Sequence, residues 1–364
     1  MLKNIAISTL VFLLSNLLNI SSFATPYPGR VESDSRTYFY DATDSEIPCD
    51  YMRIKQLGKG SFGVVYSVER RSDGEIFALK ISKEPLDNSW IKEANESERS
   101  ILLGLEHPNI LRYKHGFSEE NYDTDCKHIG SITYTFYELL DNDLYQWMTS
   151  SRCTFADCIY IFSQILSGLV YLEQREIIHG DLKPENVFLG EEKSDSEEFP
   201  YLHVVIGDFG AAFTKGSERA AGAEYRTSLL YRAPEHFEAI AEETPSRHDR
   251  IDVWALGCIL YELLSGTQVF TLPEYKPLKE EGSGSSSLMP DLWESSILPQ
   301  MEGVRQLLNS LHEEEPSSEQ VSAVFQYLNL NTVSDLSEKD RLLFALILSD
   351  MLQLDPDARI SACE

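Results

Sequence analysis

The sequence predicts an α+β fold in which a small β-rich half precedes a larger helical half. Residues 53–82 alternate apolar and polar side chains with the period of two that is typical of strands. From Leu144 onward apolar side chains recur at helical spacing, most clearly over residues 155–173 and 253–265. The chain of 364 residues is long enough to bury a sizeable core. We therefore expect the boundary between the two halves near residues 138–143.

The β-rich half is predicted to contain several strands and one helix. Its strand-like stretches lie near residues 53–57, 64–68, 76–81, 110–117 and 131–139. The Ser-Asp-Gly sequence at 72–74 is a hairpin-turn signal between the second and third strands. Helical spacing over residues 90–106 predicts a helix, which the His-Pro-Asn sequence at 107–109 ends. Later in the chain, the Gly- and Ser-containing residues 276–300 are expected to form a flexible surface insertion.

The first residues predict a secretory signal peptide. Lys3 precedes an apolar run over residues 5–20, and small residues precede a cleavage point after Ala24. We therefore expect a signal peptide at residues 1–24, a leader or linker at residues 25–50, and a location that is secreted or within the secretory pathway. A retained membrane anchor is the alternative, because the apolar run is nearly long enough to span a bilayer. If the peptide is cleaved, we expect no stable membrane span.

The net charge is strongly negative, which limits the classes of partner that the chain is expected to bind. The chain has 59 Asp and Glu against 31 Lys and Arg, which gives a net charge of −28 at pH 7. This charge disfavours nucleic-acid binding through phosphate contacts, and it disfavours docking on an anionic membrane. It favours basic partners, although a solvated acidic surface explains the charge equally well. None of the six cysteines forms a CxxC pair, which argues against a zinc ribbon.

Two motifs in the β-rich half are of the kind that binds a nucleotide. Residues 57–65 read LGKGSFGVV, and such glycines let backbone N–H groups approach a polyphosphate. Strands are expected on both sides of this loop, so it does not fit the strand-then-helix arrangement of a dinucleotide site. Lys80 closes the third strand, and its candidate partners on the following helix are Glu93, Glu96 and Glu98. We favour Glu98, whose spacing from the end of the helix lets it face inward.

Two further motifs supply the charged groups that phosphoryl transfer needs. Residues 179–186 read HGDLKPEN, and residues 208–210 read DFG. Together they supply a base, a phosphate contact and two magnesium ligands from two Asp, one Lys and one Asn. Any one motif has modest value alone, but all of them in this order are not expected by chance.

Taken together, these motifs resemble those of the eukaryotic-type protein kinase family. The resemblance runs from about residue 53 to the end, because the Ala-Pro-Glu at 233–235, the Asp-x-Trp-x-x-Gly at 252–257 and Arg359 also follow in family order. It implies the two-lobed protein kinase fold over residues 51–364, with ATP and Mg²⁺ as cofactors. The N-lobe would span about residues 51–139 and the C-lobe about residues 140–364.

The resemblance also assigns roles to particular residues. Asp181 would orient the acceptor hydroxyl and take its proton, and Lys183 would neutralise charge on the transferring phosphate. Asp252 would brace the catalytic loop, and Glu235 would pair with Arg359. The residues that would bind ATP are Leu57, Gly58, Lys59, Gly60, Ser61, Phe62, Gly63, Val64, Val65, Lys80, Glu98, Glu138 and Leu140, the last two through backbone groups that meet adenine. The residues that would bind magnesium are Asn186 and Asp208.

The same resemblance predicts the substrate class. Lys183 after Asp181, and Ser228 before the Ala-Pro-Glu segment, are typical of kinases that phosphorylate Ser and Thr. Residues 231–235 read YRAPE, as in the group that contains the cyclin-dependent, MAP and dual-specificity kinases. We therefore expect an ATP-dependent serine/threonine protein kinase, a transferase that moves the γ-phosphate of ATP to a protein substrate, which the acidic surface predicts to be basic. The alternative is a pseudokinase that acts as a binding or scaffold module.

One position in the catalytic loop departs from this family pattern. Gly180 replaces the Arg that usually precedes the catalytic Asp and meets a phosphate on the activation loop, so we expect activity without loop phosphorylation.

The predicted secreted location conflicts with the need of a kinase for ATP. ATP is scarce outside the cell, so a secreted kinase would be either a microbial effector acting in a host cell or a lumenal enzyme. The sequon at Asn95 lies on the helix that bears Glu98, where a glycan would crowd the helix, which disfavours a glycosylating lumen.

Overall fold

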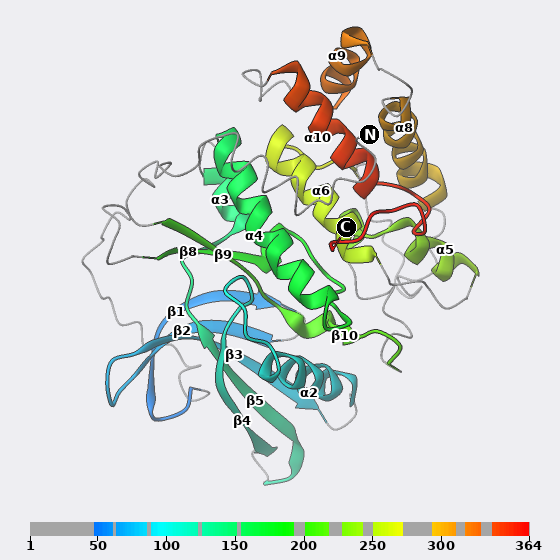
Figure 1. Cartoon of the computed structure of the whole chain (residues 1–364). Coiled ribbons are helices and arrows are strands. Elements are labelled where there is room, and N and C mark those ends of the chain that lie inside the picture. Colours follow the sequence, from blue (N-terminus) through cyan, green and yellow to red (C-terminus); the bar gives the residue numbers. More distant parts are fainter. Residues whose placement is uncertain are drawn as a thin grey trace, which may run out of the picture. The chain divides into compact units, whose positions relative to one another are not determined.

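The computed structural model divides the chain into two units. The residues that the structure describes are 47–60, 63–85, 89–122, 126–150, 154–192, 201–217, 228–242, 250–271, 293–310, 317–328 and 337–363. One unit contains the described residues up to Asn142 together with Phe188–Gly210, and the other contains Asp143–Val187 and Ala211–Glu364. The first carries the largest sheet and the second most of the helices (Figure 1), which confirms the predicted α+β architecture. Outside the described residues lie the predicted signal peptide 1–24, nearly all of the leader 25–50, and Ser61 and Phe62 of the glycine-rich motif.

The first unit is built on a five-stranded antiparallel sheet. Its strands are β1 (Tyr51–Gly60), β2 (Gly63–Arg70), β3 (Ile76–Pro85), β4 (Tyr113–Tyr122) and β5 (His128–Glu138). They lie in the order β1-β2-β3-β5-β4. The helix α2 (Ser89–Leu103) follows β3 and packs against it (Figure 1). The predicted turn between β2 and β3 is present, and Gly74 adopts the positive φ of 76° that favours glycine.

The two faces of this sheet differ in character. Strand alternation places Leu79 and Phe136, which are partners in register, on an apolar face. The other buried members of that apolar cluster are Tyr51, Tyr66, Val68, Phe77, Ile81 and Tyr134. Lys80 and Thr135 are also partners in register and lie on the opposite face. Helix α2 covers this second face, because its Glu98 contacts Lys80, so the alternation separates the apolar core from the charged groups.

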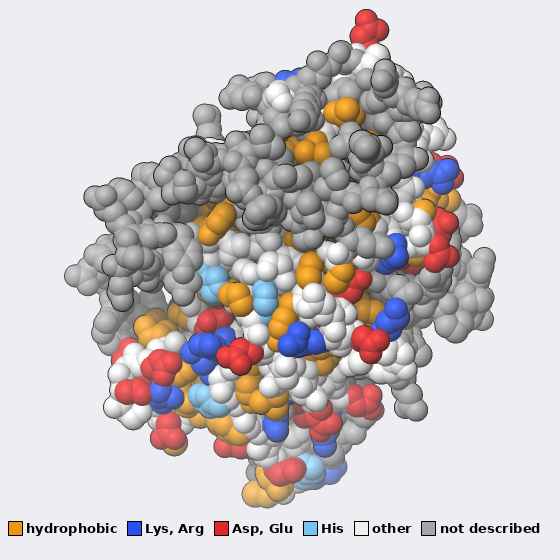
Figure 2. Space-filling model, viewed as in Figure 1, with side chains coloured by type: hydrophobic (Ala, Val, Ile, Leu, Met, Phe, Trp, Pro, Cys, Tyr) orange, Lys and Arg blue, Asp and Glu red, His pale blue; other side chains and the backbone are white. Residues whose placement is uncertain are grey.

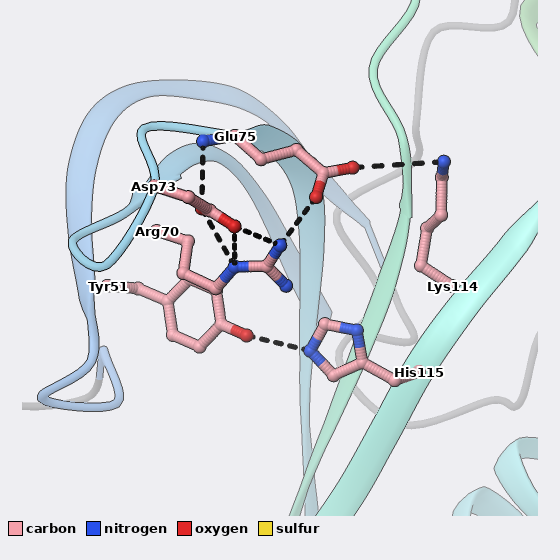
Figure 3. A network of polar contacts seen from close by, with 6 residues as sticks. All are labelled: Tyr51, Arg70, Asp73, Glu75, Lys114 and His115. Carbon is pink, nitrogen blue, oxygen red and sulfur yellow. Dashed lines mark hydrogen bonds and ion pairs between the residues drawn. The ribbon is translucent and has the colours of Figure 1, made fainter.

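Polar contacts at one end of the sheet join three of its strands (Figure 3). They involve Tyr51 of β1, Arg70 of β2, Asp73 and Glu75 between β2 and β3, and Lys114 and His115 of β4. Arg70 Nη2 lies 2.7 Å from Asp73 Oδ2 and 2.5 Å from Glu75 Oε2. The Tyr51 hydroxyl lies 2.7 Å from His115 Nε2. Because Asp73 and Glu75 are solvent-exposed and Arg70 is partly exposed, these ion pairs orient the turn but contribute little to stability.

β8 and β9 lie in a smaller, three-stranded sheet, and backbone hydrogen bonds join β9 to residues 109–111 of the first unit. The sheet contains β6 (Asn142–Asp143), β8 (Val187–Glu192) and β9 (Tyr201–Ile206), in the order β6-β8-β9. The Leu111 N–H donates to the Ile206 carbonyl (2.8 Å), and the Ile206 N–H donates to the Asn109 carbonyl (2.9 Å). Because this segment bonds to β9, the strand predicted from residue 110 begins only at Tyr113.

The second unit is predominantly helical. Its helices are α3 (Leu144–Ser150), α4 (Phe155–Glu173), α5 (Pro234–Glu242), α6 (Ile251–Ser265), α8 (Leu298–Asn309), α9 (Ser318–Tyr327) and α10 (Glu338–Met351). Single helical turns lie at Pro184–Asn186, Leu229–Tyr231 and Trp293–Ile297, and the short strands β7 (Ile177–Ile178) and β10 (Phe213–Thr214) pair antiparallel. A further helical turn spans Phe209–Ala211, and its last residue, Ala211, is where the chain re-enters this second unit. Helix α6 is almost wholly buried and packs against α4 and α10 (Figure 1), and the helices predicted at 155–173 and 253–265 are confirmed.

Helix α4 is a core helix. Among the described residues it is the one helix long and apolar enough to cross a membrane, with 19 residues and a mean hydropathy of 1.5 in its most apolar stretch. Half of that stretch is buried within the protein, as expected for a helix that packs against others. A capping box between Thr154 and Asp157 begins the helix, because each side chain accepts a hydrogen bond from the backbone of the other.

We expected a flexible insertion over residues 276–300, but the C-terminal end of this range is helical in the structure. Residues 272–292 lie outside the described residues, but Trp293–Ile297 and the start of α8 are helical. Ile297 and Met301 are buried, so apolar packing orders a segment whose sequence resembles a linker.

Candidate active site

The described residues of the glycine-rich motif lie on the paired antiparallel strands β1 and β2. Gly60, which ends β1, and Gly63, which begins β2, are partners in register. Gly63 has a φ of +142°, and a Cβ there would lie 2.2 Å from the Ile81 backbone oxygen, so only glycine fits. A Cβ on Gly58 would meet no atom within 4 Å, which leaves open space where a ligand can approach the backbone. The other described residues of the motif are Leu57 and Lys59 on β1 and Val64 and Val65 on β2.

Lys80 is held by two carboxylates. Its Nζ lies 2.7 Å from Glu98 Oε2 on α2 and 3.5 Å from Asp208 Oδ1. Burial alone would lower the pKa of Lys80, but attraction to Glu98 and Asp208 outweighs it and raises the pKa above its ordinary value. Lys80 is therefore positively charged at neutral pH. Of the candidate glutamates, the structure brings Glu98 to Lys80, whereas the exposed Glu96 lies 4.0 Å from Lys92.

Tyr137 on β5 belongs to the same group and was missed by the sequence analysis. Its hydroxyl donates to Glu98 Oε1 over 2.8 Å, and both side chains are buried. The signal that could have found it is strand alternation. Tyr137 lies two residues after Thr135, which pairs with Lys80, so both tyrosine and lysine project from the same face of the sheet.

Glu138 and Leu140 lie at the end of β5 and just after it. The Glu138 N–H donates to the Arg112 carbonyl (3.1 Å), and Glu138 Oε1 accepts from the Arg112 N–H (2.8 Å). The Leu140 side chain packs beside Gly190, where a Cβ would lie 2.8 Å from Leu140 Cδ2. These contacts hold the segment in place, and its contact with adenine remains a prediction.

In the second unit, the HGDLKPEN loop gathers polar groups around Asp181. Asp181 Oδ2 accepts from Lys183 Nζ (2.8 Å), and Asp181 Oδ1 accepts from the Ser228 N–H (2.7 Å). Lys183 Nζ also donates to Ser228 Oγ (2.8 Å), and Asn186 Nδ2 donates to the Asp181 carbonyl (2.7 Å). A small pocket, lined by Asp181, Ser228 and Tyr231 among others, lies beside this group. The carboxylate of Asp181 is thus oriented through both oxygens.

Asp252 of α6 braces this loop, as the resemblance implied. Its Oδ2 accepts from the His179 N–H (2.7 Å), and its Oδ1 accepts from the Gly180 N–H (3.0 Å). Burial raises the pKa of Asp252 above its ordinary value, although His179 and the two N–H donors oppose the rise. Gly180 itself has a φ of +78°, and a Cβ there would lie 3.0 Å from the Ala211 carbonyl oxygen. This backbone therefore favours glycine at the position where the family usually has Arg.

The expected ion pair between Glu235 and Arg359 is present and buried. Arg359 Nη1 lies 2.7 Å from Glu235 Oε1, and Nη2 lies 2.9 Å from Oε2. The guanidinium also donates to the backbone oxygens of Gln353 and Arg250. This bidentate geometry fixes the start of α5 to the C-terminal segment.

The residues expected to bind magnesium fit a hard cation by type. Mg²⁺ takes oxygen ligands and is usually held by one or two carboxylates together with substrate phosphates. Asn186 directs its amide nitrogen at the Asp181 carbonyl, which turns its amide oxygen away from that contact. The Asp208 side chain is 39% exposed. Among the residues described, no three or more His, Cys, Asp or Glu form a cluster that could hold a metal ion.

Comparison with known proteins defines the class to which this fold and these motifs belong. A family model described as the protein kinase domain matches residues 51–364, so the chain belongs to the eukaryotic-type protein kinase family and has its two-lobed fold. Within this family it is similar to plant mitogen-activated protein kinases. Mitogen-activated protein kinase 2 of Arabidopsis thaliana is 30% identical over 351 residues, which cover 94% of this chain and 83% of that protein. Mitogen-activated protein kinase 3 of Oryza sativa subsp. japonica is 33% identical over 236 residues, which cover 64% of this chain and 59% of that protein.

These relatives correct the predicted location. The N-terminal residues 1–24 led us to expect a secreted chain or one in the secretory pathway. That prediction is wrong, because the relatives are mitogen-activated protein kinases, a class of intracellular signalling enzyme. The prediction rested only on the composition of a short apolar run after a basic residue. The secreted location is not retained, and neither are its effector and membrane-anchored variants.

Proposed function

We propose that the chain is an ATP-dependent protein kinase that transfers the γ-phosphate of ATP to Ser or Thr hydroxyls of proteins. The observation that carries this proposal is the arrangement around Asp181, whose carboxylate is fixed through both oxygens by Lys183 and Ser228. A carboxylate oriented in this way can accept a hydrogen bond from an acceptor hydroxyl and then its proton. Membership of the protein kinase family and similarity to mitogen-activated protein kinases support the same conclusion.

The transfer needs placement and charge rather than a covalent intermediate. The acceptor oxygen forms a bond to the γ-phosphorus while the bond from that phosphorus to the bridging oxygen breaks, ADP leaves, and the hydroxyl proton passes to Asp181. Lys183 would offset negative charge on the transferring group, and Lys80 would hold the other phosphates. Asn186 and Asp208 would hold Mg²⁺, which when bound neutralises phosphate charge.

The preference for Ser and Thr is supported by the contact between Lys183 and Ser228. Lys183 Nζ donates to Ser228 Oγ over 2.8 Å while it also contacts Asp181, so the two residues typical of Ser/Thr kinases lie directly beside the proposed base. The similarity to mitogen-activated protein kinases agrees with a protein substrate.

A basic substrate is supported by charge rather than by one acidic patch. The chain carries a net charge of −28, yet Asp and Glu are mixed with Lys and Arg on the face drawn in Figure 2. Glu185 of the HGDLKPEN loop is exposed, and a charged carboxylate there would attract a cationic side chain of the substrate.

The test is phosphate transfer by the full chain. With radiolabelled ATP, Mg²⁺ and a generic basic protein, we expect label on Ser or Thr. Asp181→Asn should reduce transfer about 100- to 10,000-fold, the range typical of a lost general base, while MgATP still raises the thermal unfolding temperature. Asp73→Asn, in the exposed network of Figure 3, is the matched control and should transfer at the wild-type rate.

Three outcomes would contradict parts of this proposal. Wild-type rates in Asp181→Asn would refute the assignment of the base. Label on Tyr alone would refute the Ser/Thr preference. Nucleotide binding without any transfer by the wild-type chain would replace the enzyme with a scaffold that has kept the fold.

A further inference from the structure

Both oxygens of the Glu98 carboxylate are engaged by residues of the sheet. Lys80 Nζ lies 2.7 Å from Oε2, and the Tyr137 hydroxyl donates to Oε1 over 2.8 Å. Glu98 is 4% exposed and Tyr137 is 5% exposed, so water does not compete freely for either group. Burial raises the pKa of Tyr137, and the charge of Glu98 raises it further, so the phenol keeps its proton and remains a donor.

Lys80 has a second carboxylate within reach. Asp208 Oδ1 lies 3.5 Å from Lys80 Nζ, and Asp208 belongs to the DFG motif. The two carboxylates therefore compete for one ammonium group. A Glu98 carboxylate held only by Lys80 could rotate about its side-chain torsions, and the lysine would then shift toward Asp208. The Tyr137 hydroxyl opposes this rotation, because it fixes the oxygen that Lys80 does not contact.

A second polar contact fixes the backbone of α2 one turn earlier. Asn95 Nδ2 donates to Glu84 Oε1 over 2.7 Å, and the same buried carboxylate accepts from Ser131 (2.8 Å) and Thr133 (2.7 Å) on β5. Residues 95 and 98 lie on the same face of α2. The helix is thus anchored on β3 and β5, so what Tyr137 adds is the orientation of the Glu98 carboxylate. The contact also takes the nitrogen of the Asn95 sequon out of solvent, so a glycan there is incompatible with this packing.

We propose that Tyr137 is a positioning residue for phosphoryl transfer, which acts by holding Glu98 so that Lys80 is presented to the ATP phosphates rather than drawn to Asp208. This inference rests on the proposed kinase function. It assigns to a strand residue outside every motif a part in setting the geometry of the nucleotide site.

The test is Tyr137→Phe in the full chain, which removes the hydroxyl and keeps the ring. We expect kcat/KM for ATP to fall about tenfold, the size expected when a hydrogen bond to a charged group is lost. KM for the protein substrate should not change. Tyr66→Phe is the matched control, because Tyr66 is a buried tyrosine of the same sheet that belongs to the apolar cluster on its other face. It should leave both constants at their wild-type values.

A double-mutant cycle separates positioning from general packing. In a Glu98→Ala background, adding Tyr137→Phe should change kcat/KM for ATP less than twofold, because the hydroxyl no longer has its carboxylate. The same tenfold loss in that background, or wild-type kinetics of Tyr137→Phe alone, would overturn the inference while leaving the kinase assignment intact. A wild-type chain that transfers no phosphate would instead refute the proposed function, and the inference would fail with it.

Discussion

Alanine at position 180 should destabilise the second unit more than alanine at another glycine of the same unit. Gly180 has a φ of +78°, and an added Cβ would lie 3.0 Å from the Ala211 carbonyl oxygen and 3.3 Å from a ring carbon of Phe213. The left-handed backbone costs a residue with a Cβ about 1–2 kcal/mol. Crowding against Ala211 and Phe213 adds about 1–2 kcal/mol more. We therefore expect Gly180→Ala to lower the free energy of unfolding by about 2–4 kcal/mol.

Gly266 provides the matched control. Its φ is +72°, close to that of Gly180, but a Cβ there would meet no atom within 4 Å. Gly266→Ala should therefore show the backbone cost alone, about 1–2 kcal/mol. Urea unfolding measures both variants, and an unchanged slope with a lower midpoint identifies a loss of stability. Phosphate transfer should fall further in Gly180→Ala, because the Gly180 N–H donates to Asp252 beside the proposed base.

Equal losses of stability in the two alanine variants would refute this reasoning, because the contact with Ala211 would then carry no cost. Gly180→Arg tests the same point against the family pattern. It places the usual family residue on a backbone that resists any Cβ, so we expect a stability no higher than that of Gly180→Ala. An arginine variant as stable as the wild type would show that the loop adjusts freely.

Two further predictions concern buried polar groups. Glu235→Gln leaves the fully buried Arg359 without a counter-charge and should lower the free energy of unfolding by about 3–5 kcal/mol; a loss below about 1 kcal/mol in urea unfolding would contradict the proposed importance of that pair. Asn95→Ala removes one of the three donors to buried Glu84 and should cost about 1–3 kcal/mol. Asn95→Asp should be worse by the same assay, because it places a second carboxylate against Glu84, and equal stability of the two variants would be inconsistent with this contact.

Motif spacing was sufficient to find residues that act within one short segment. The HGDLKPEN loop places Asp181, Lys183 and Asn186 close in sequence, and the structure brings these three together. Helical periodicity was also informative, because it separated Glu98, which faces the sheet, from Glu96, which is exposed. In both cases the deciding geometry is local, so the sequence contains it.

Contacts between distant segments were harder to predict. Asn109 and Ile206 form backbone hydrogen bonds although they are far apart in the chain, and neither belongs to a recognisable pairing motif. The prediction therefore extended a strand through residues 110–117, where apolar alternation continued. In the structure the chain returns to the first unit over Phe188–Gly210, a segment that includes these distant contacts. Alternation shows that a segment is extended but does not show which strand it will pair with.

The Tyr137 contact shows most clearly what register adds to a motif. Lys80 pairs with Thr135, so Tyr137 projects from the same face and reaches Glu98. A slip of one residue between β3 and β5 would place Phe136 there instead and turn Tyr137 into the apolar cluster. The motif residues would be unchanged, yet Glu98 would be held through one oxygen only. If the proposed role of Tyr137 is correct, the precision of the Lys80 site depends on strand register as well as on the residues that define the family.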